Sequence, residues 1–60
     1  MPARFVIFKD SRRQYRFRLV APNNKIIAVS ESYNSKAGCI NGIKSVRRNA
    51  PRAEVVDLTE

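Results

Sequence analysis

The sequence predicts an α+β fold of order β-β-β-α-β, with an antiparallel sheet and one helix. Runs of β-branched and aromatic residues fill the first half of the chain, and the hydrophobic period then changes from two to about 3.6. A short apolar segment follows the predicted helix. The chain has 60 residues, so we expect one small domain, residues 1–60, whose core is marginal without a partner subunit.

Three strands are predicted before the helix. Residues 4–9 are a short apolar run that ends at a polar turn. Residues 14–21 alternate, with Tyr15, Phe17 and Leu19 on one face of a strand and Arg16, Arg18 and Val20 on the other. Asn23 and Asn24 predict a tight turn after them, because Asn tolerates the positive φ that such turns need. Residues 25–31 predict the third strand. Its middle is apolar on both sides, which is typical of the central or best-covered strand of a small sheet.

One helix is predicted between residue 36 and residue 49. Ser35 can cap its N-terminus, and Pro51 stops it because the residue before proline avoids helical angles. The helix has an apolar stripe with the spacing i, i+4, i+7 and i+11: Cys39, Ile43, Val46 and Ala50. Residues 53–58 then read as a short fourth strand.

The fourth strand also predicts an assembly. It is acidic, whereas all 12 Lys and Arg residues precede it. One helix covers one face of a small sheet, and both sheet edges stay unpaired. Exchange of the terminal strand between two copies would pair an edge and bring acidic residues to basic ones. We therefore expect an intertwined homodimer, with these interface residues: Ala53, Glu54, Val55, Val56, Asp57 and Leu58.

The formal net charge of +7 permits two interpretations. Two cations share a strand face about 7 Å apart, close to a phosphate spacing, and four cluster around the helix end. These six candidates for sequence-independent nucleic-acid binding are Arg16, Arg18, Lys44, Arg47, Arg48 and Arg52. The pattern favours the other interpretation, in which the strand cations pair with the acidic strand or are solvated and the helix cations complement the helix dipole.

Aromatic side chains offer a related pair of interpretations. Phe5, Phe8 and Phe17 could stack nucleotide bases beside the arginines. Their alternation with aliphatic residues favours packing in the core instead.

Catalysis and cofactor binding are not expected. The chain has no histidine, and its one cysteine, Cys39, lies on the apolar stripe. A general base would have to be a carboxylate such as Asp10 or Glu31, and no metal-ligand cluster or phosphate-binding fingerprint is present. No apolar run suits a signal peptide or a membrane span, so we expect a cytoplasmic protein. The sequence favours a non-enzymatic structural or interaction module.

A set of motifs extends over residues 5–57, almost the whole chain: Lys9-Asp10, Tyr15-Arg16-Phe17-Arg18-Leu19, Ala21-x-Asn23, Ile27-Ala28-x-Ser30-Glu31-x-Tyr33-x-Ser35-Lys36 and Gly42-Ile43-x-Ser45-Val46-x-x-Asn49-Ala50. In these motifs the chain resembles the YegP-like family of small domains of unknown function. The resemblance implies a β3-αβ unit, two of which share one sheet and swap their C-terminal strands. It implies no activity, because the family is uncharacterised.

The chain departs from the family at three turn positions. The family usually has glycine where this chain has Arg13, Asn24 and Ser32. Asn24 can still adopt a left-handed conformation cheaply, whereas Arg13 and Ser32 cannot do so as easily. We therefore expect a different local turn at Arg13 and Ser32.

Overall fold

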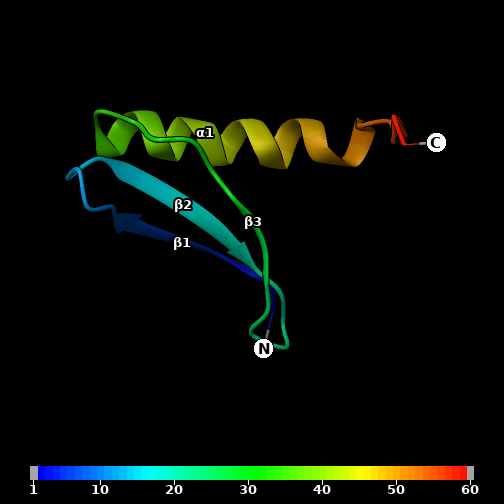
Figure 1. The fold of residues 1–60 in the computed structure, drawn as a ribbon, viewed down its shortest axis with the longest axis horizontal. Helices are drawn as coiled ribbons and strands as arrows, with labels where there is room; N and C mark the ends of the chain where they lie inside the picture. Colours follow the sequence, from blue (N-terminus) through cyan, green and yellow to red (C-terminus); the bar gives the residue numbers. More distant parts are fainter. Residues whose placement is uncertain (1, 60) are drawn as a thin grey trace.

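A computed structural model describes residues 2–59 as one sheet with a helix against it (Figure 1). The strands β1 (Arg4–Lys9), β2 (Tyr15–Val20) and β3 (Ile26–Val29) lie in the order β1-β2-β3, and both pairs are antiparallel. The helix α1 (Lys36–Asn49) crosses one side of the sheet and continues into a 3₁₀ turn, η1 (Ala50–Arg52). The predicted α+β fold is confirmed for these elements. No helix formed by the described residues is long and apolar enough to cross a membrane.

The turn between β1 and β2 is built around Asp10. Its Oδ1 accepts hydrogen bonds from the backbone N–H groups of Arg12, at 2.9 Å, and Gln14, at 3.0 Å. Its backbone carbonyl accepts from the N–H of Arg13 at 3.0 Å. Arg13 adopts the left-handed φ of 63°, so the expectation of a different turn there is wrong. The hydrogen bonds to Asp10 hold a conformation that costs a non-glycine residue about 1–2 kcal/mol.

The other two turn positions behave as predicted. Asn24 adopts the left-handed conformation, with φ 68°, and its side-chain oxygen accepts a 2.8 Å hydrogen bond from Arg4. Ser32 does not adopt a positive φ. Its hydroxyl instead donates to Oδ2 of Asp10 at 3.1 Å, which ties the segment before the helix to the first turn.

β3 lies at the edge of the sheet. Its residues Ile26, Ile27 and Val29 are 56%, 60% and 50% exposed. The prediction of a central strand at residues 25–31 is therefore wrong, because β2 occupies the centre and no described residue pairs with the outer edge of β3. The apolar character of both faces of β3 has no explanation within one copy of the chain.

The core lies between β2 and the first half of α1. Among residues 2–59 three are buried. Phe17 and Cys39 lie on the helix side of the sheet, and strand alternation places Val20 on the other side. The ring of Tyr33, which precedes α1, stacks on Phe17 with 6.3 Å between centroids. Tyr33 also lies directly against Gly42, where a Cβ atom would come within 2.7 Å of the ring carbon Cζ. The helix can approach the sheet this closely because Gly42 has no side chain.

The ends of α1 follow the sequence closely. Ser35 caps the helix as predicted, since its Oγ accepts a 3.0 Å hydrogen bond from the N–H of Gly38. The apolar stripe is covered only at its start: Cys39 is buried, Ile43 and Val46 are half-buried and Ala50 is exposed. Figure 1 shows why, because the second half of α1 continues past the strands.

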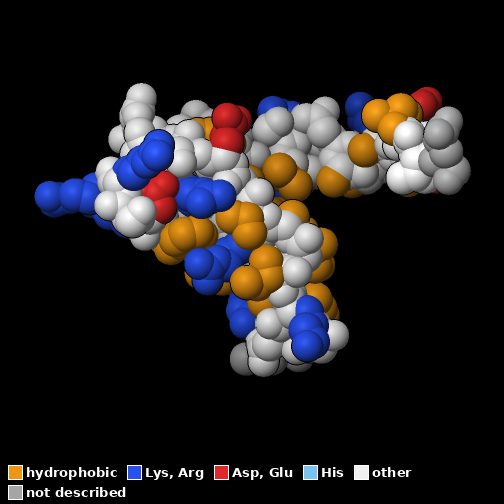
Figure 2. Space-filling view, viewed as in Figure 1, with side chains coloured by type: hydrophobic (Ala, Val, Ile, Leu, Met, Phe, Trp, Pro, Cys, Tyr) orange, Lys and Arg blue, Asp and Glu red, His pale blue; other side chains and the backbone are white. Residues whose placement is uncertain are grey.

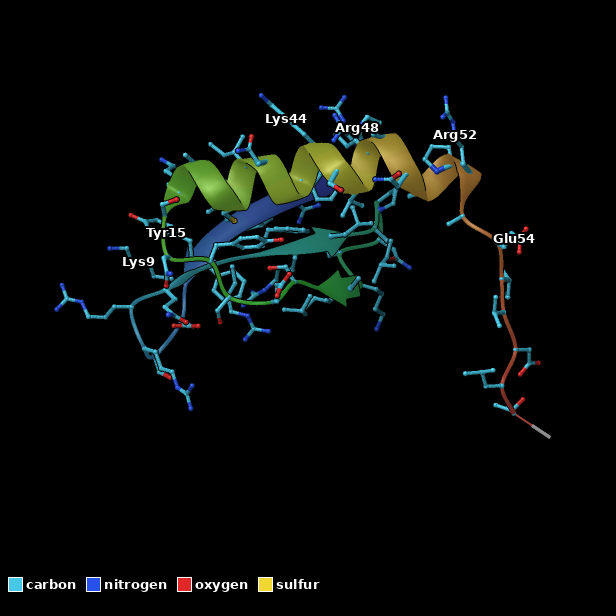
Figure 3. All side chains as sticks on the ribbon, turned by 90° about the horizontal axis from the view of Figure 1, so that it is seen from above. Lys9, Tyr15, Lys44, Arg48, Arg52 and Glu54 are labelled. Carbon is cyan, nitrogen blue, oxygen red and sulfur yellow. The ribbon has the colours of Figure 1, made fainter. Side chains whose placement is uncertain are left out.

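Residues 53–59 leave η1 as a segment outside the sheet, and the predicted strand at residues 53–58 is not formed within the single chain. The segment starts beyond the strands, at the far end of α1, and runs away from the sheet (Figure 3). Val55, Val56 and Leu58 are 96%, 71% and 89% exposed. Hydrophobic side chains also line the open angle between α1 and the strands (Figure 2).

Candidate interaction surfaces

The structure divides the six candidate cations between two faces. Residues of β2 alternate across the sheet, and Phe17 faces α1 because it packs against Tyr33 and Gly42. Arg16 and Arg18 therefore lie on the opposite side, which no element covers (Figure 1). We call this side the open sheet face. The four cations of the helix end lie on α1 and η1, on the other side of the sheet, so the six residues do not form one groove.

Arg16 is fixed by the backbone at the end of β3. Its Nε and Nη2 atoms donate hydrogen bonds to the carbonyl oxygen of Ser30, at 3.0 and 2.8 Å. The hydroxyl of Ser30 in turn accepts from the N–H of Phe17 at 2.9 Å. Within one chain, Arg16 thus binds a carbonyl group rather than the carboxylates of the C-terminal segment.

Arg18 lies over an aromatic ring on the open sheet face. Its guanidinium carbon Cζ is 4.0 Å from the centroid of Phe8, a distance typical of a cation–π contact. Phe8 pairs with Arg16 in the sheet register and is half-buried. The core position predicted for Phe8 is therefore wrong, since the strand register turns its ring away from α1. Phe5 and Phe17 do meet on the helix side, with 5.8 Å between ring centroids.

The helix end carries the second group of cations. These residues are exposed and come from α1 and η1: Lys44, Arg47, Arg48 and Arg52. Figure 3 shows Lys44, Arg48 and Arg52 on the side of the helix turned away from the strands. No acidic residue occurs between residues 36 and 52, so no carboxylate lies along the helix to pair with them at i, i+4 spacing. We call these four residues the helix cation stripe.

The C-terminal segment combines exposed apolar and acidic side chains. Asp57 accepts hydrogen bonds from the backbone N–H and the hydroxyl of Thr59, and these bonds lower the pKa of its carboxyl group. Glu54 lies on the segment beyond the end of η1 (Figure 3). Asp57 is thus ionised at neutral pH, and both acidic residues are exposed and available to a basic partner surface.

Two of the groups that could support catalysis, Asp10 and Cys39, are hydrogen-bonded and buried, respectively. Asp10 accepts hydrogen bonds from Gln14, Arg12 and Ser32; the bond from Gln14 contributes most, and together they lower the pKa of the carboxyl group. A carboxylate held in this way is a weak general base. Burial raises the pKa of the Cys39 thiol, which leaves it protonated.

No pocket forms among residues 2–59, and no three His, Cys, Asp or Glu side chains of that range group as metal ligands would. Sequence reasoning missed the role of Asp10 as the link between two loops. The sequence contains a signal for this role, because the side chain of an Asp at the start of a turn commonly accepts a hydrogen bond from the backbone N–H of the residue two positions later.

Comparison with known proteins extends over nearly the whole chain. The model of a family described as a domain of unknown function, DUF1508, matches residues 10–57. A UPF0339 protein of Treponema denticola is 55% identical over 58 residues, which cover 97% of this chain and 100% of that protein. Another, from Methanosarcina acetivorans, is 50% identical over 56 residues, covering 93% and 97%. A protein from Haloferax volcanii, solved by NMR in solution, has a similar fold, with a TM-score of 0.87, 46% identity and coverage of 93% and 95%.

Proposed function

We propose that this chain, which belongs to the DUF1508 family of unknown function, is a non-enzymatic interaction module that works as a homodimer. The C-terminal segment carries the proposal, because Val55, Val56 and Leu58 are almost fully exposed in a single chain. β3 supplies the complementary feature, an apolar edge strand without an outer neighbour. A segment rich in β-branched residues and a bare sheet edge satisfy each other's backbone hydrogen bonds when they pair.

In the proposed dimer, residues 53–58 of each copy add to the sheet of the other copy. Because the dimer has twofold symmetry, the same exchange occurs twice, and the same residues of each copy take part. Burying a Val or Leu side chain contributes about 1.5–3 kcal/mol, so three such residues per copy contribute roughly 9–18 kcal/mol per dimer. This gain is of the size needed to offset an association cost of about 4–15 kcal/mol.

Light scattering coupled to size exclusion tests this proposal. We expect twice the mass of one chain for the wild type and its loss on deletion of residues 53–60 or in Val56→Asp, which places a charge in the interface. Asn23→Asp adds the same charge in an exposed turn and serves as the matched control, with no expected change in mass. A wild type with the mass of one chain would contradict the dimer. A dimeric, folded deletion variant would contradict the role of the segment.

A second candidate function is binding of nucleic acid without sequence preference. The observation in its favour is the helix cation stripe, which places four exposed cations along α1 and η1 without an acidic residue among them. Such a surface attracts a phosphate backbone by releasing its counterions. Arg16 and Arg18 add charge on the open sheet face, on the other layer.

Fluorescence anisotropy with a labelled duplex across a salt series tests the second candidate. We expect the logarithm of affinity to fall linearly with the logarithm of salt concentration. Arg48→Glu should weaken binding strongly, whereas Arg12→Glu, the same charge change in the exposed β1–β2 turn, should weaken it far less. Equal losses of duplex affinity in the two variants would show that binding depends on the net charge of the protein and not on the helix cation stripe. No binding at low salt would reject this function and leave the interaction module intact.

A further inference from the structure

The open sheet face combines aromatic, apolar and cationic side chains. The strand register places eight residues on it. Three lie at one end of the face, Arg4, Val20 and Ile26, and the other five are Val6, Phe8, Arg16, Arg18 and Val29. Three of the strand pairings join them directly, Val6 with Arg18, Phe8 with Arg16 and Arg18 with Val29. Addition of a strand at a sheet edge extends a sheet without covering its faces, so this face also stays open in the proposed dimer.

Phe8 and Arg18 form a layered pair at the centre of the open sheet face. The guanidinium carbon Cζ lies over the ring, 4.0 Å from its centroid, well within the range of a cation–π contact. Both residues are half-buried rather than enclosed. A planar cation held on an aromatic ring is a surface on which a nucleotide base stacks, and stacking tolerates any base because each has a π-face.

Arg16 supplies a fixed positive charge beside this pair. Two of its five N–H donors bind the carbonyl of Ser30, and three remain for a ligand. The charge of Arg16 also acts on Asp10, whose carboxylate accepts hydrogen bonds from the β1–β2 turn and from Ser32. The net charge of +7 adds long-range attraction for a polyanion.

We propose that the open sheet face binds single-stranded nucleic acid, with a base stacked on the Phe8–Arg18 pair and a phosphate at Arg16. The inference deepens the second candidate function and rests on it. An exposed sheet surface favours a single strand over a duplex, because paired bases are stacked on one another and cannot offer their faces. A duplex contacts the helix cation stripe instead.

NMR titration of the isotope-labelled full chain with dT12 tests the location of the site without any variant. We expect the largest amide shifts at Phe8, Arg16 and Arg18, and small ones along the helix cation stripe. Shifts confined to α1 and η1 would overturn the inference while leaving nucleic-acid binding in place. Absence of any shift at low salt, with dT12 and with a duplex, would overturn both.

Anisotropy with labelled dT12 and a 12-bp duplex then tests the stacking. Phe8→Leu keeps an apolar side chain and should weaken dT12 binding roughly 5- to 150-fold, the range expected for loss of one stacked base. Arg18→Lys keeps the charge and should weaken it about 2- to 5-fold. Arg12→Lys makes the same change in the exposed β1–β2 turn and is the matched control, with dT12 affinity unchanged. Circular dichroism melting checks that each variant folds. If Phe8→Leu does not fold, Arg18→Lys is used to compare the losses of dT12 and duplex affinity. Unchanged dT12 affinity in a folded Phe8→Leu variant, or equal losses for dT12 and duplex, would overturn the inference.

Discussion

Replacing Gly42 with alanine tests the packing of the helix on the sheet. Gly42 lies in the interior of α1, where alanine is normally the more stable residue by about 1 kcal/mol. In this structure the added Cβ would lie 2.7 Å from Cζ of Tyr33 and 3.3 Å from Cε2 of Phe17. The Tyr33 ring cannot simply swing aside, because it is stacked on Phe17 between the sheet and the helix.

Gly42→Ala raises the helix propensity of α1 but crowds the rings beneath it, and we expect the crowding to have the larger effect on stability. Overpacking of a well-filled site costs about 1–3 kcal/mol, and overlap with two rings places this site toward the upper end. After subtraction of the gain in helix propensity, the variant should lose about 1–2 kcal/mol of unfolding free energy. That loss lowers the ratio of folded to unfolded protein by roughly 5- to 30-fold.

Urea denaturation followed by circular dichroism at one fixed protein concentration measures the effect. Gly38→Ala is the matched control, because it makes the same change one turn earlier. Its Cβ would lie 3.2 Å from Oγ of Ser35 and no closer than 3.7 Å to Tyr33. We expect Gly38→Ala to be neutral or stabilising. A Gly42→Ala variant that is also more stable than the wild type would refute the packing of Tyr33 beneath the helix.

Two further predictions concern the turn between β1 and β2. Arg13→Gly should stabilise the fold by roughly 0.5–1 kcal/mol in urea denaturation, because glycine adopts φ 63° without strain; a loss of stability would show that the Arg13 side chain contributes more than its backbone costs. The pKa of Asp10 is lowered in the folded state, so its ionised form contributes stability that is present above the ordinary value of 3.8 and is lost as pH falls through the folded pKa. Asp10→Asn should therefore be less stable than the wild type at pH 7, with the difference shrinking below pH 3.8 in parallel acid titrations; a difference that stays constant with pH would contradict this.

Local signals predicted the secondary structure well. β1 occupies residues 4–9 as predicted, and the cap at Ser35 and the end of α1 follow from residue types near each boundary. The left-handed Arg13 could not be predicted, because its conformation depends on hydrogen bonds gathered by Asp10 rather than on its own preference. The edge position of β3 was missed for a different reason. A strand that is apolar on both faces is typical of a buried strand, and in the proposed dimer the C-terminal segment of the other copy would pair with the outer edge of β3.

The candidate site was predictable in part. The helix cation stripe follows directly from spacing on one helix. Placement of Arg16 and Arg18 on the face opposite Phe17 follows from strand alternation, but contact with Phe8 also depends on the hairpin register. A slip of one residue would turn Phe8 to the other face of the sheet. Turn geometry sets that register, and the turn at Arg13 was the part of the hairpin that the sequence did not reveal.

The salt dependence of duplex binding tests the proposed dimer and the proposed duplex interface together. One helix cation stripe offers four phosphate contacts, which predicts a salt slope of about −3.6 on duplex DNA. A dimer carries two stripes, and a slope near −7 arises only if both contact the same duplex. Val56→Asp, which is expected to separate the copies without touching any cation of the stripe, should then return the slope to the value for one helix. The slope thus shows whether both copies contact the same duplex or only one of them does. The number of released counterions depends on how many cations reach one polymer, and not on how tightly the two chains associate.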